Sequence, residues 1–423
     1  MRLAEARGGR GERVVSFDEA LEIVQQQAAW ARMPRVERLR LEAAVGRVLA
    51  VSITTDRDQP PFDRSTRDGF AVRAADADAG TWLAVAGQVR AGTQWEGELR
   101  GDEAIEIMTG APVPEGADAV VMLEYVERSG TVAKPAIRLA EGRRISAGEN
   151  IVCRGAEARA GDEVLVAGKE MDPAAIALAA ACGAGALEVF ARPTVSIVAT
   201  GDELVDVDEA PGPQQIRNSN SYGLAALVTQ AGGAPQRMPV APDRREELET
   251  LILEARTADL MLLSGGVSVG EYDLVEEVLR GLGAEFFFTG VKMQPGKPVV
   301  FGQVPERDGM RGVYFFGLPG NPVSTQVTFA CFVEPMLRAM RGASGEGPRF
   351  VQATLADAVP GKPDLTRVLP ARLMSKRERP EVKLVVWQGS GDMPALARSN
   401  CYAVLPQGVG RFQQGDVITV LLR

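Results

Sequence analysis

The spacing of apolar residues predicts helices at both ends of the N-terminal half of the chain. Ser16–Trp30 has a helical period, with its first residue as the N-cap. Residues 39–50 predict a short strand and a helix joined by Gly46. Pro173–Cys182 predicts a helix closed by Gly183. We therefore expect the chain to return there and pack on its own N-terminal helices.

Residues 51–152, between these helices, show a different pattern. Short apolar runs alternate with Gly, Pro and Asp, at Trp82–Ala86, Ala104–Met108, Ala119–Met122 and Ala136–Leu139. Short runs with turn residues between them are typical of strands. The pattern predicts a β-rich insert.

From Thr194 onward, strand-like and helix-like segments alternate. The predicted strands are Val195–Thr200, Arg237–Val240 and Leu260–Ser264, and the predicted helices are Ser219–Ala231, Arg244–Ala255, Leu274–Leu282 and, further on, Val323–Met340. Such alternation indicates a mostly parallel α/β sheet, whose ligands bind at the carboxyl ends of its strands.

The last segment, residues 350–423, returns to strands. Apolar runs at Lys383–Trp387, Cys401–Leu405 and Val417–Leu421 are separated by Gly and Pro. They predict a small β-barrel or β-sandwich.

Composition narrows the possible functions. A chain of 423 residues with 45% apolar side chains is long enough for two to four domains. Its formal charge of -9 disfavours general nucleic-acid binding, and the chain lacks the run of about 18 apolar residues needed to span a bilayer. We expect a cytoplasmic protein without a nucleic-acid or membrane partner.

The chain contains no histidine and four widely spaced cysteines. Imidazole bases and His-based metal sites are therefore excluded, and reduced, structural thiols are expected. A bound metal would need oxygen ligands, which makes Mg²⁺ the first candidate.

The candidate site residues lie on three Gly- and Pro-rich strings that follow or flank strand-like runs, Ser264–Gly270, Gln294–Pro298 and Gly317–Pro322. In the first string, free N–H groups and Ser268 suit a phosphate, and Asp273 suits Mg²⁺. The alternatives are a strand-to-helix turn and an N-cap role for Asp273. Lys297 is either an anion ligand or a surface lysine.

Carboxylates also follow the predicted strands. Asp202 and Glu203 come after the first strand and are either solvated or ligand-binding, while Asp243 comes after the second and is either a ligand or an N-cap. Pro319–Pro322 would direct the first N–H groups of the following helix into the same crevice, or form only a stiff helix entry. Residues alone indicate a Mg²⁺-dependent enzyme acting on a phosphorylated compound.

Seven motifs taken together resemble the molybdopterin molybdenumtransferases, called MoeA in bacteria and matching the E domain of gephyrin. In chain order they read PFDRSTRDGFAVR, IMTGAPVPEGADAVVM, GENIVCRGAE, ATGDELV, SGGVSVGEYD, QPGKPVVFG and GLPGNPVS. The resemblance extends roughly from Ser16 to Leu421.

The resemblance implies an α/β multidomain fold with a central three-layer molybdopterin-binding domain and a dimeric subunit in which this domain faces the partner's insert. The expected domains are residues 1–50 plus 153–190 (a discontinuous helical/β domain), 51–152 (the β-rich insert), 191–343 (the α/β domain) and 348–423 (a C-terminal β-barrel). The implied reaction takes molybdate and adenylylated molybdopterin, uses Mg²⁺, and releases AMP and molybdenum cofactor. Expected protein partners are a molybdopterin adenylyltransferase and molybdoenzyme apo-proteins.

The resemblance also implies residue roles. The catalytic set is Asp68, Thr109, Glu203, Asp243, Asp273 and Lys297, with Asp273 and Asp243 at the metal. The pterin- and phosphate-binding set is Gly265, Gly266, Ser268, Gly270, Pro295, Gly296, Pro319, Gly320, Asn321, Pro322 and Ser324.

Three departures from the family pattern affect charge. Val152 and Cys153 stand where arginines are common, so that only Arg154 remains in that loop, and Gln294 replaces a lysine. Lys292 and Arg67 are possible substitutes for the missing charge.

Three other functions are alternatives to this one. A molybdopterin adenylyltransferase lacks the insert and the barrel, and a nucleotide-processing relative of competence-damage proteins has a different glycine loop. A non-enzymatic scaffold is disfavoured by the full set of crevice carboxylates.

Overall fold

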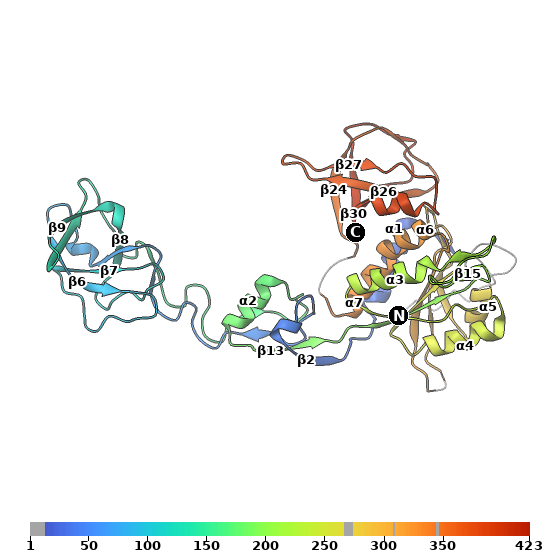
Figure 1. Ribbon diagram of the computed structural model, residues 1–423, viewed down its shortest axis with the longest axis horizontal. Helices are drawn as coiled ribbons and strands as arrows, with labels where there is room; N and C mark the ends of the chain where they lie inside the picture. Colours follow the sequence, from blue (N-terminus) through green and yellow to red (C-terminus); the bar gives the residue numbers. More distant parts are fainter. Residues whose placement is uncertain (1–12, 266–273, 308, 344–346) are drawn as a thin grey trace, which may run out of the picture.

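The chain forms an elongated molecule with a narrow neck (Figure 1). The structure, a computed structural model, describes residues 13–265, 274–307, 309–343 and 347–423. One globular unit, the insert, lies at one end; a small unit around α2 lies midway; and two larger units lie together at the other end. Among the described helices, none is long and apolar enough to cross a membrane.

The central unit is a six-stranded sheet with the order β17-β14-β18-β23-β22-β19, in which the first four strands are parallel. The strands are β14 (Thr194–Ala199), β17 (Ala234–Arg237), β18 (Leu260–Ser264), β19 (Glu285–Phe288), β22 (Val300–Val304) and β23 (Val313–Leu318). The predicted alternation is confirmed.

Helices cover both faces of this sheet, because successive buried side chains of its strands point to opposite sides. The helices are α1 (Phe17–Ala28), α3 (Ser219–Gln230), α6 (Pro322–Thr328) and α7 (Glu334–Met340) on one face, and α4 (Arg245–Ala255) and α5 (Leu274–Gly281) on the other. Ile197 belongs to the first apolar core and Val198 to the second. The expected three-layer fold is present.

Two predicted elements of this unit differ in detail. β17 begins three residues before the predicted strand at Arg237, because its pairing with β14 starts at Ala234 and Pro239 has no N–H for the ladder. The helix predicted over Val323–Met340 is divided by a π-helical segment, Phe329–Val333. Pro335 follows it and has no N–H for a regular helical bond.

The insert is an antiparallel-rich sheet with the order β8-β5-β7-β6-β10-β9. Its strands are β5 (Gly69–Val72), β6 (Leu83–Val89), β7 (Glu103–Ile107), β8 (Ala119–Met122), β9 (Val126–Thr131) and β10 (Lys134–Leu139). Each of its two apolar cores consists entirely of residues between 70 and 151. The insert therefore has cores of its own, as the run of short strands predicts.

The small midway unit contains α2 (Pro173–Ala181), β2 (Val36–Arg40) paired with β13 (Ala186–Phe190), and β3 (Ile53–Thr54) paired with β12 (Glu163–Leu165). The helix predicted within residues 39–50 is wrong. Only the short 3₁₀ turn Leu41–Ala43 forms, because Leu49 pairs with Val189 and competes with helical bonding.

The N-terminal helix also packs differently from the prediction. Ser16 caps α1 by accepting a hydrogen bond from the Glu19 N–H, as its sequence indicates. However, Phe17, Ala20 and Val24 pack in the α/β core, not against α2. α2 instead packs on residues such as Leu49 and Val189.

The C-terminal unit resolves the choice between a barrel and a sandwich. Its strands are β24 (Phe350–Leu355), β26 (Thr366–Met374), β27 (Glu381–Leu384), β28 (Cys401–Leu405) and β30 (Val417–Leu422). They pair in the order β26-β27-β24-β30-β28, and β28 pairs back to β26, which closes a five-stranded barrel. β21 (Met293–Gln294) joins the barrel to the α/β unit through β26.

Candidate active site

A cavity of about 740 Å³ lies at the carboxyl ends of β14, β18 and β23. Six segments line it, namely Ala199–Gly201 with Glu203 and Leu204, Ile216–Asn220, Asp243, Ser264–Gly265, Leu274 with Glu277, and Pro298 with Pro319–Pro322. Parallel strands end at a common edge, which brings their following loops together. Most of the described candidate residues of the α/β unit therefore meet here.

Asp243 is held in this cavity by the loop that follows β14. Its Oδ1 accepts a hydrogen bond of 2.7 Å from the Thr200 hydroxyl, and its backbone N–H donates to Asp202 Oδ1 at 3.1 Å. The N-cap of α4 is Arg244, without a side-chain cap. Asp243 is therefore oriented by the end of β14 and does not cap the helix, which leaves its carboxylate exposed to the cavity.

Glu203 also faces the cavity and is exposed. Its carboxylate folds back over Gly201, where an added Cβ would come within 2.5 Å of Glu203 Oε2. Gly201 has a φ of +146° and is buried. Because Gly201 has no side chain, the Glu203 carboxylate can lie against it at the end of β14.

The N-terminus of α3 is a part of the site that the sequence interpretation missed. Asn218 caps the helix by accepting from the Ser221 N–H, and it lines the cavity with Ser219 and Asn220. Asn220 Nδ2 donates to the Gly320 carbonyl at 2.7 Å and to Ser264 Oγ at 3.1 Å. An Asn-Ser-Asn string directly before a helix after a short strand is the signal that would have identified it.

Asn220 joins two of the predicted glycine loops. Gly320 and Gly265 approach so closely that a Cβ on Gly320 would lie 3.8 Å from Gly265 Cα. Gly265 has a φ of +96°, and a Cβ there would come within 2.4 Å of the Thr200 carbonyl oxygen. Gly265 therefore allows the ends of β14 and β18 to approach each other at the cavity.

The Pro319–Pro322 turn lines the cavity, but its N–H groups are not all directed into it. The Val323 N–H donates to the Ser390 carbonyl, and Asn321 makes no side-chain cap for α6. Ser324 is buried and is not among the lining residues. The expectation that the first N–H groups of this helix face the crevice is thus wrong for Val323.

The Gln294–Pro298 loop reaches the cavity through Pro298. Pro295 and Gly296 are buried, and a Cβ on Gly296 would come within 2.5 Å of Thr328 Cγ2. Lys297 is exposed, and its carbonyl accepts from the Val291 N–H. Packing therefore explains the glycine, while the ammonium of Lys297 remains accessible beside the cavity.

Arg367 brings a second positive charge to this loop. It pairs in register with Gln294 across β21 and β26, and its Nη1 donates to the Pro360 carbonyl at 2.5 Å. Arg367 Nε and Gln294 Oε1 are both buried and lack hydrogen-bond partners. Burial lowers the pKa of the Arg367 guanidinium. Sequence reasoning missed this arginine because it comes from the barrel, more than 70 positions away.

Asp68 and Thr109, the predicted site residues of the insert, contact each other. Asp68 Oδ1 accepts from the Thr109 N–H at 2.7 Å and from its hydroxyl at 2.9 Å. Both bonds lower the pKa of the Asp68 carboxyl, and the bond from the backbone N–H has the larger effect. The two residues are exposed at adjoining ends of β5 and β7. They do not line the α/β cavity, and the insert lies at the opposite end of the molecule (Figure 1).

Four predicted site residues, Gly266, Ser268, Gly270 and Asp273, lie outside the described residues. Within the part of the chain that is described, no group of three or more carboxylate or thiol side chains is placed to bind a metal ion. Asp243 nevertheless suits Mg²⁺, because one of its oxygens is fixed by Thr200 and the carboxylate faces the cavity.

Three family models together match most of the chain. Residues 15–183 match the MoeA N-terminal region (domain I and II), residues 196–339 a probable molybdopterin binding domain, and residues 352–422 the MoeA C-terminal region (domain IV).

Individual relatives agree over nearly the full length. The molybdopterin molybdenumtransferase of Staphylococcus aureus (strain COL) is 33% identical over 421 residues, covering 96% of this chain and 95% of that protein. Its counterpart in Nostoc is 36% identical, covering 91% of this chain and 88% of the relative. The crystal structure of the molybdopterin biosynthesis moeA protein from Pyrococcus horikoshii OT3 is 29% identical, with a TM-score of 0.79, and 97% and 100% of the two chains are covered. The chain belongs to the molybdopterin molybdenumtransferase family.

Proposed function

We propose that this protein inserts molybdenum into adenylylated molybdopterin and releases AMP in a Mg²⁺-dependent reaction. The observation that carries the proposal is the cavity at the ends of β14, β18 and β23, where carboxylates meet a helix N-terminus. Both features suit a phosphorylated substrate, the carboxylates through a metal ion and the helix through its dipole. The family of the chain agrees with this chemistry.

The cavity offers separate places for the charges of the substrates. The N-terminus of α3 and Arg217 line one part of the cavity and suit phosphate oxygens. Lys297 and Arg367 flank the Gln294 loop, where the anion molybdate would be attracted. In this arrangement Arg367 replaces the charge that the family commonly supplies at position 294.

Asp243 is the residue that we expect to hold Mg²⁺, together with Asp273. Thr200 and Asp202 fix the position of Asp243, so that its carboxylate does not have to reorganise when the substrate binds. When bound, Mg²⁺ would neutralise phosphate oxygens at the scissile phosphoanhydride. Glu203 would contact the substrate from the other side of Gly201.

The complete site requires a second copy of the chain. Asp68 and Thr109 belong to the insert, which the neck separates from the cavity of their own chain (Figure 1). A homodimer in which the insert of one chain meets the cavity of the other would bring the two sets together. Exposed apolar residues after α1 offer a surface for such an assembly, since Trp30 is 80% exposed and Met33 55%.

Other expected properties follow from this reaction. The substrate would come from a molybdopterin adenylyltransferase, and the product would pass to molybdoenzyme apo-proteins. We expect this exchange to take place in the cytoplasm.

AMP release from adenylylated molybdopterin tests the proposal. We expect Mg²⁺- and molybdate-dependent release by the wild type, a loss of about 100-fold or more in kcat for Asp243→Asn, and a similar loss for Asp273→Ala. Asp208→Asn is the matched control, because Asp208 is exposed in the same region but does not line the cavity. No release by the wild type, or equal losses in all variants, would contradict the proposal.

A further inference from the structure

The neck that carries the insert consists of two antiparallel segments, residues 55–63 and 153–162, which we call the neck segments. Short ladders flank them, β3 with β12 on the side of the body and β4 (Arg64–Ser65) with β11 (Ile151–Val152) on the side of the insert. Between these ladders the backbones are hydrogen-bonded from Thr55 to Asp162 and Gly161, from Gln59 to Ala158 and Glu157, and from Pro60 to Gly155. The backbone bridge of Gln59 with Ala158 lies in the middle of the neck. Because only two segments connect the insert to the body, side chains that cross between them help to set its orientation.

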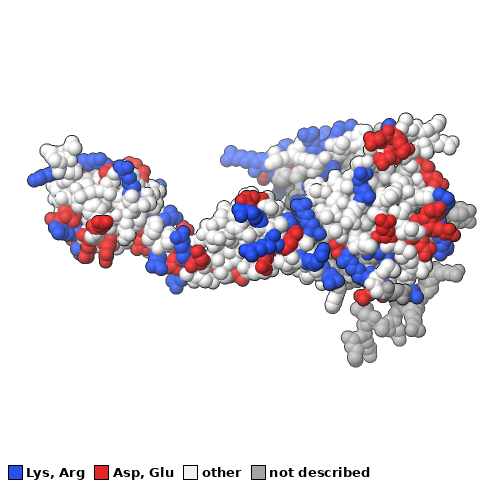
Figure 2. All heavy atoms as spheres, turned by 60° about the horizontal axis from the view of Figure 1, so that its bottom comes forward, with Lys and Arg blue, Asp and Glu red and all other residues white. Residues whose placement is uncertain are grey.

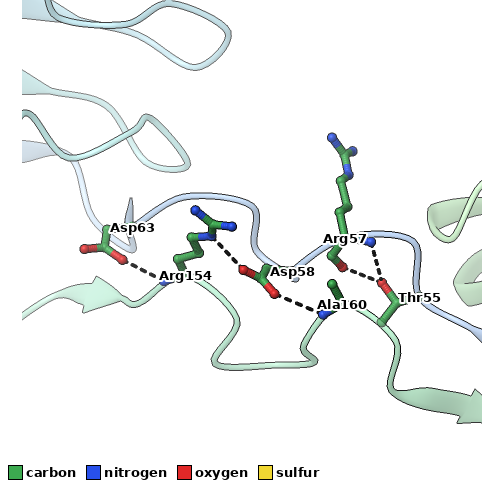
Figure 3. A network of polar contacts seen from close by, with 6 residues as sticks. All are labelled: Thr55, Arg57, Asp58, Asp63, Arg154 and Ala160. Atoms are coloured by element: carbon green, nitrogen blue, oxygen red, sulfur yellow. Dashed lines mark hydrogen bonds and ion pairs between the residues drawn. The ribbon is translucent and has the colours of Figure 1, made fainter.

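A charged network crosses the neck segments on both sides of this backbone bridge (Figure 3). Asp58 Oδ1 accepts from the Ala160 N–H at 3.0 Å, on the side of the body. Its Oδ2 accepts from Arg154 Nε at 2.6 Å, on the side of the insert. The Arg154 N–H in turn donates to Asp63 Oδ1 at 2.6 Å. The three residues thus form a diagonal connection from one end of the neck to the other.

The charged side chains of the neck lie in pairs of opposite sign. The side chain of Asp58 is 22% exposed, and the bonds from Ala160 and then Arg154 lower its pKa, so that it stays ionised at neutral pH. A second ion pair, between Arg64 and Glu157 at 2.7 Å, also joins the two sides of the neck. In this pair the cation lies on the first of the two chain segments and the anion on the second, the reverse of Asp58 and Arg154. Figure 2 shows both signs interspersed along the narrow neck.

We propose that Arg154 and Asp58 brace the neck and act as positioning residues that fix the orientation of the insert relative to the α/β cavity. This inference rests on the proposed function, in which Asp68 and Thr109 must reach the cavity of a second copy. It also assigns a role to the arginine that remains in the GENIVCRGAE loop, whose Nε donates to Asp58.

Three variants and a matched control test the brace. Arg154→Gln and Asp58→Asn remove its charges, while Arg154→Lys keeps the charge but not the directed Nε donor. Arg57→Gln is the control, because Figure 3 shows the Arg57 guanidinium extending away from the second neck segment. All these positions are at least partly exposed, and thermal unfolding would confirm that the variants are folded.

The first readout is the distance between spin labels at Val132→Cys, in a fully exposed turn of the insert, and Glu209→Cys, on the α/β unit. Cys153→Ser removes the exposed native thiol, and the other cysteines are buried. Excess unlabelled chain limits each assembly to one labelled protomer. We expect a broader distance distribution for Arg154→Gln and Asp58→Asn than for the wild type, an intermediate one for Arg154→Lys, and no change for Arg57→Gln.

The second readout is AMP release. A misplaced insert should lower kcat about tenfold, while the KM for adenylylated molybdopterin, which binds at the α/β cavity, stays within about twofold. The inference is overturned if Arg154→Gln matches Arg57→Gln in both distance distribution and kcat. If the wild type releases no AMP, the proposed function fails, and the distance distributions alone decide whether the brace exists.

Discussion

Mixing two inactive variants is the most direct test of a site shared between two chains. Asp68→Ala damages the insert and Asp243→Ala damages the cavity, and neither residue contacts the other within one chain. In a mixed dimer, the cavity of the Asp68→Ala chain is intact and meets the intact insert of the Asp243→Ala chain. The second site of that dimer combines both defects.

The expected activity follows from counting sites. Random assembly makes about half of the dimers mixed, and each mixed dimer has one intact site of two, so that the mixture regains about one quarter of wild-type activity. Purified mixed dimers should show roughly half of the wild-type value. Each variant alone should retain about 1% or less, because in the proposed reaction each lacks a group of the active site.

The assay uses co-expressed chains with two different tags, which allow mixed dimers to be isolated in succession, and it measures molybdate-dependent AMP release. Asp68→Ala mixed with wild type provides the calibration for one intact site. No recovery in mixed dimers that are shown to contain both chains would refute a shared site. Activity above one half of the wild-type value in purified mixed dimers would also contradict the count of one intact site in each dimer.

Three further predictions concern single residues. Gly265→Ala should lower the free energy of unfolding by about 1–3 kcal/mol, because Gly265 has a positive φ and a Cβ there would meet the Thr200 carbonyl. Gly46 also has a positive φ but has open space around it, so Gly46→Ala should lower the free energy of unfolding by only about 1 kcal/mol. Equal losses for the two variants in thermal unfolding would refute the expected clash with the Thr200 carbonyl. The hydrogen bonds that lower the pKa of Asp68 contribute stability that is fully present above the unfolded pKa of the carboxyl and is lost as pH falls through its lower folded value. Thr109→Val keeps only the backbone donor and should raise that pKa in an NMR titration; an unchanged pKa would show that the hydroxyl contributes nothing. Arg367→Gln should raise the molybdate concentration for half-maximal AMP release about tenfold, and an unchanged value would remove Arg367 from the anion site.

The sequence predicts the α/β unit well because its signals are local. β14 and β18 are continuous apolar runs, as expected for strands buried on both faces. A helix with a clear N-cap, α3, follows β14, and the candidate carboxylates Glu203 and Asp243 lie in the loops that follow β14 and β17. Once parallel strands are predicted, their common edge places these two residues near each other without further information.

The sequence predicts less well those features that depend on pairing between strands far apart in the chain. The stretch from Leu39 to Ala50 has no local feature that excludes a helix, and its extended form depends on pairing with residues 169–189. The closure of the barrel depends on β28 pairing with both β26 and β30. Arg367 belongs to the same class, because only the pairing of β21 with β26 places it beside Gln294.

The neck shows most clearly how a motif and its structural role differ. In sequence, Arg154 is a positive charge in a loop that the family uses for arginines, and charge alone suggests an anion ligand. In the structure its Nε donates a hydrogen bond to Asp58 and its backbone N–H donates one to Asp63, so that its positive charge pairs with an aspartate of the other neck segment. If the insert must reach the cavity of another chain, a residue that sets the angle of the neck influences the reaction without touching a substrate. Arg154 would then be required for function for a reason that its motif alone does not indicate.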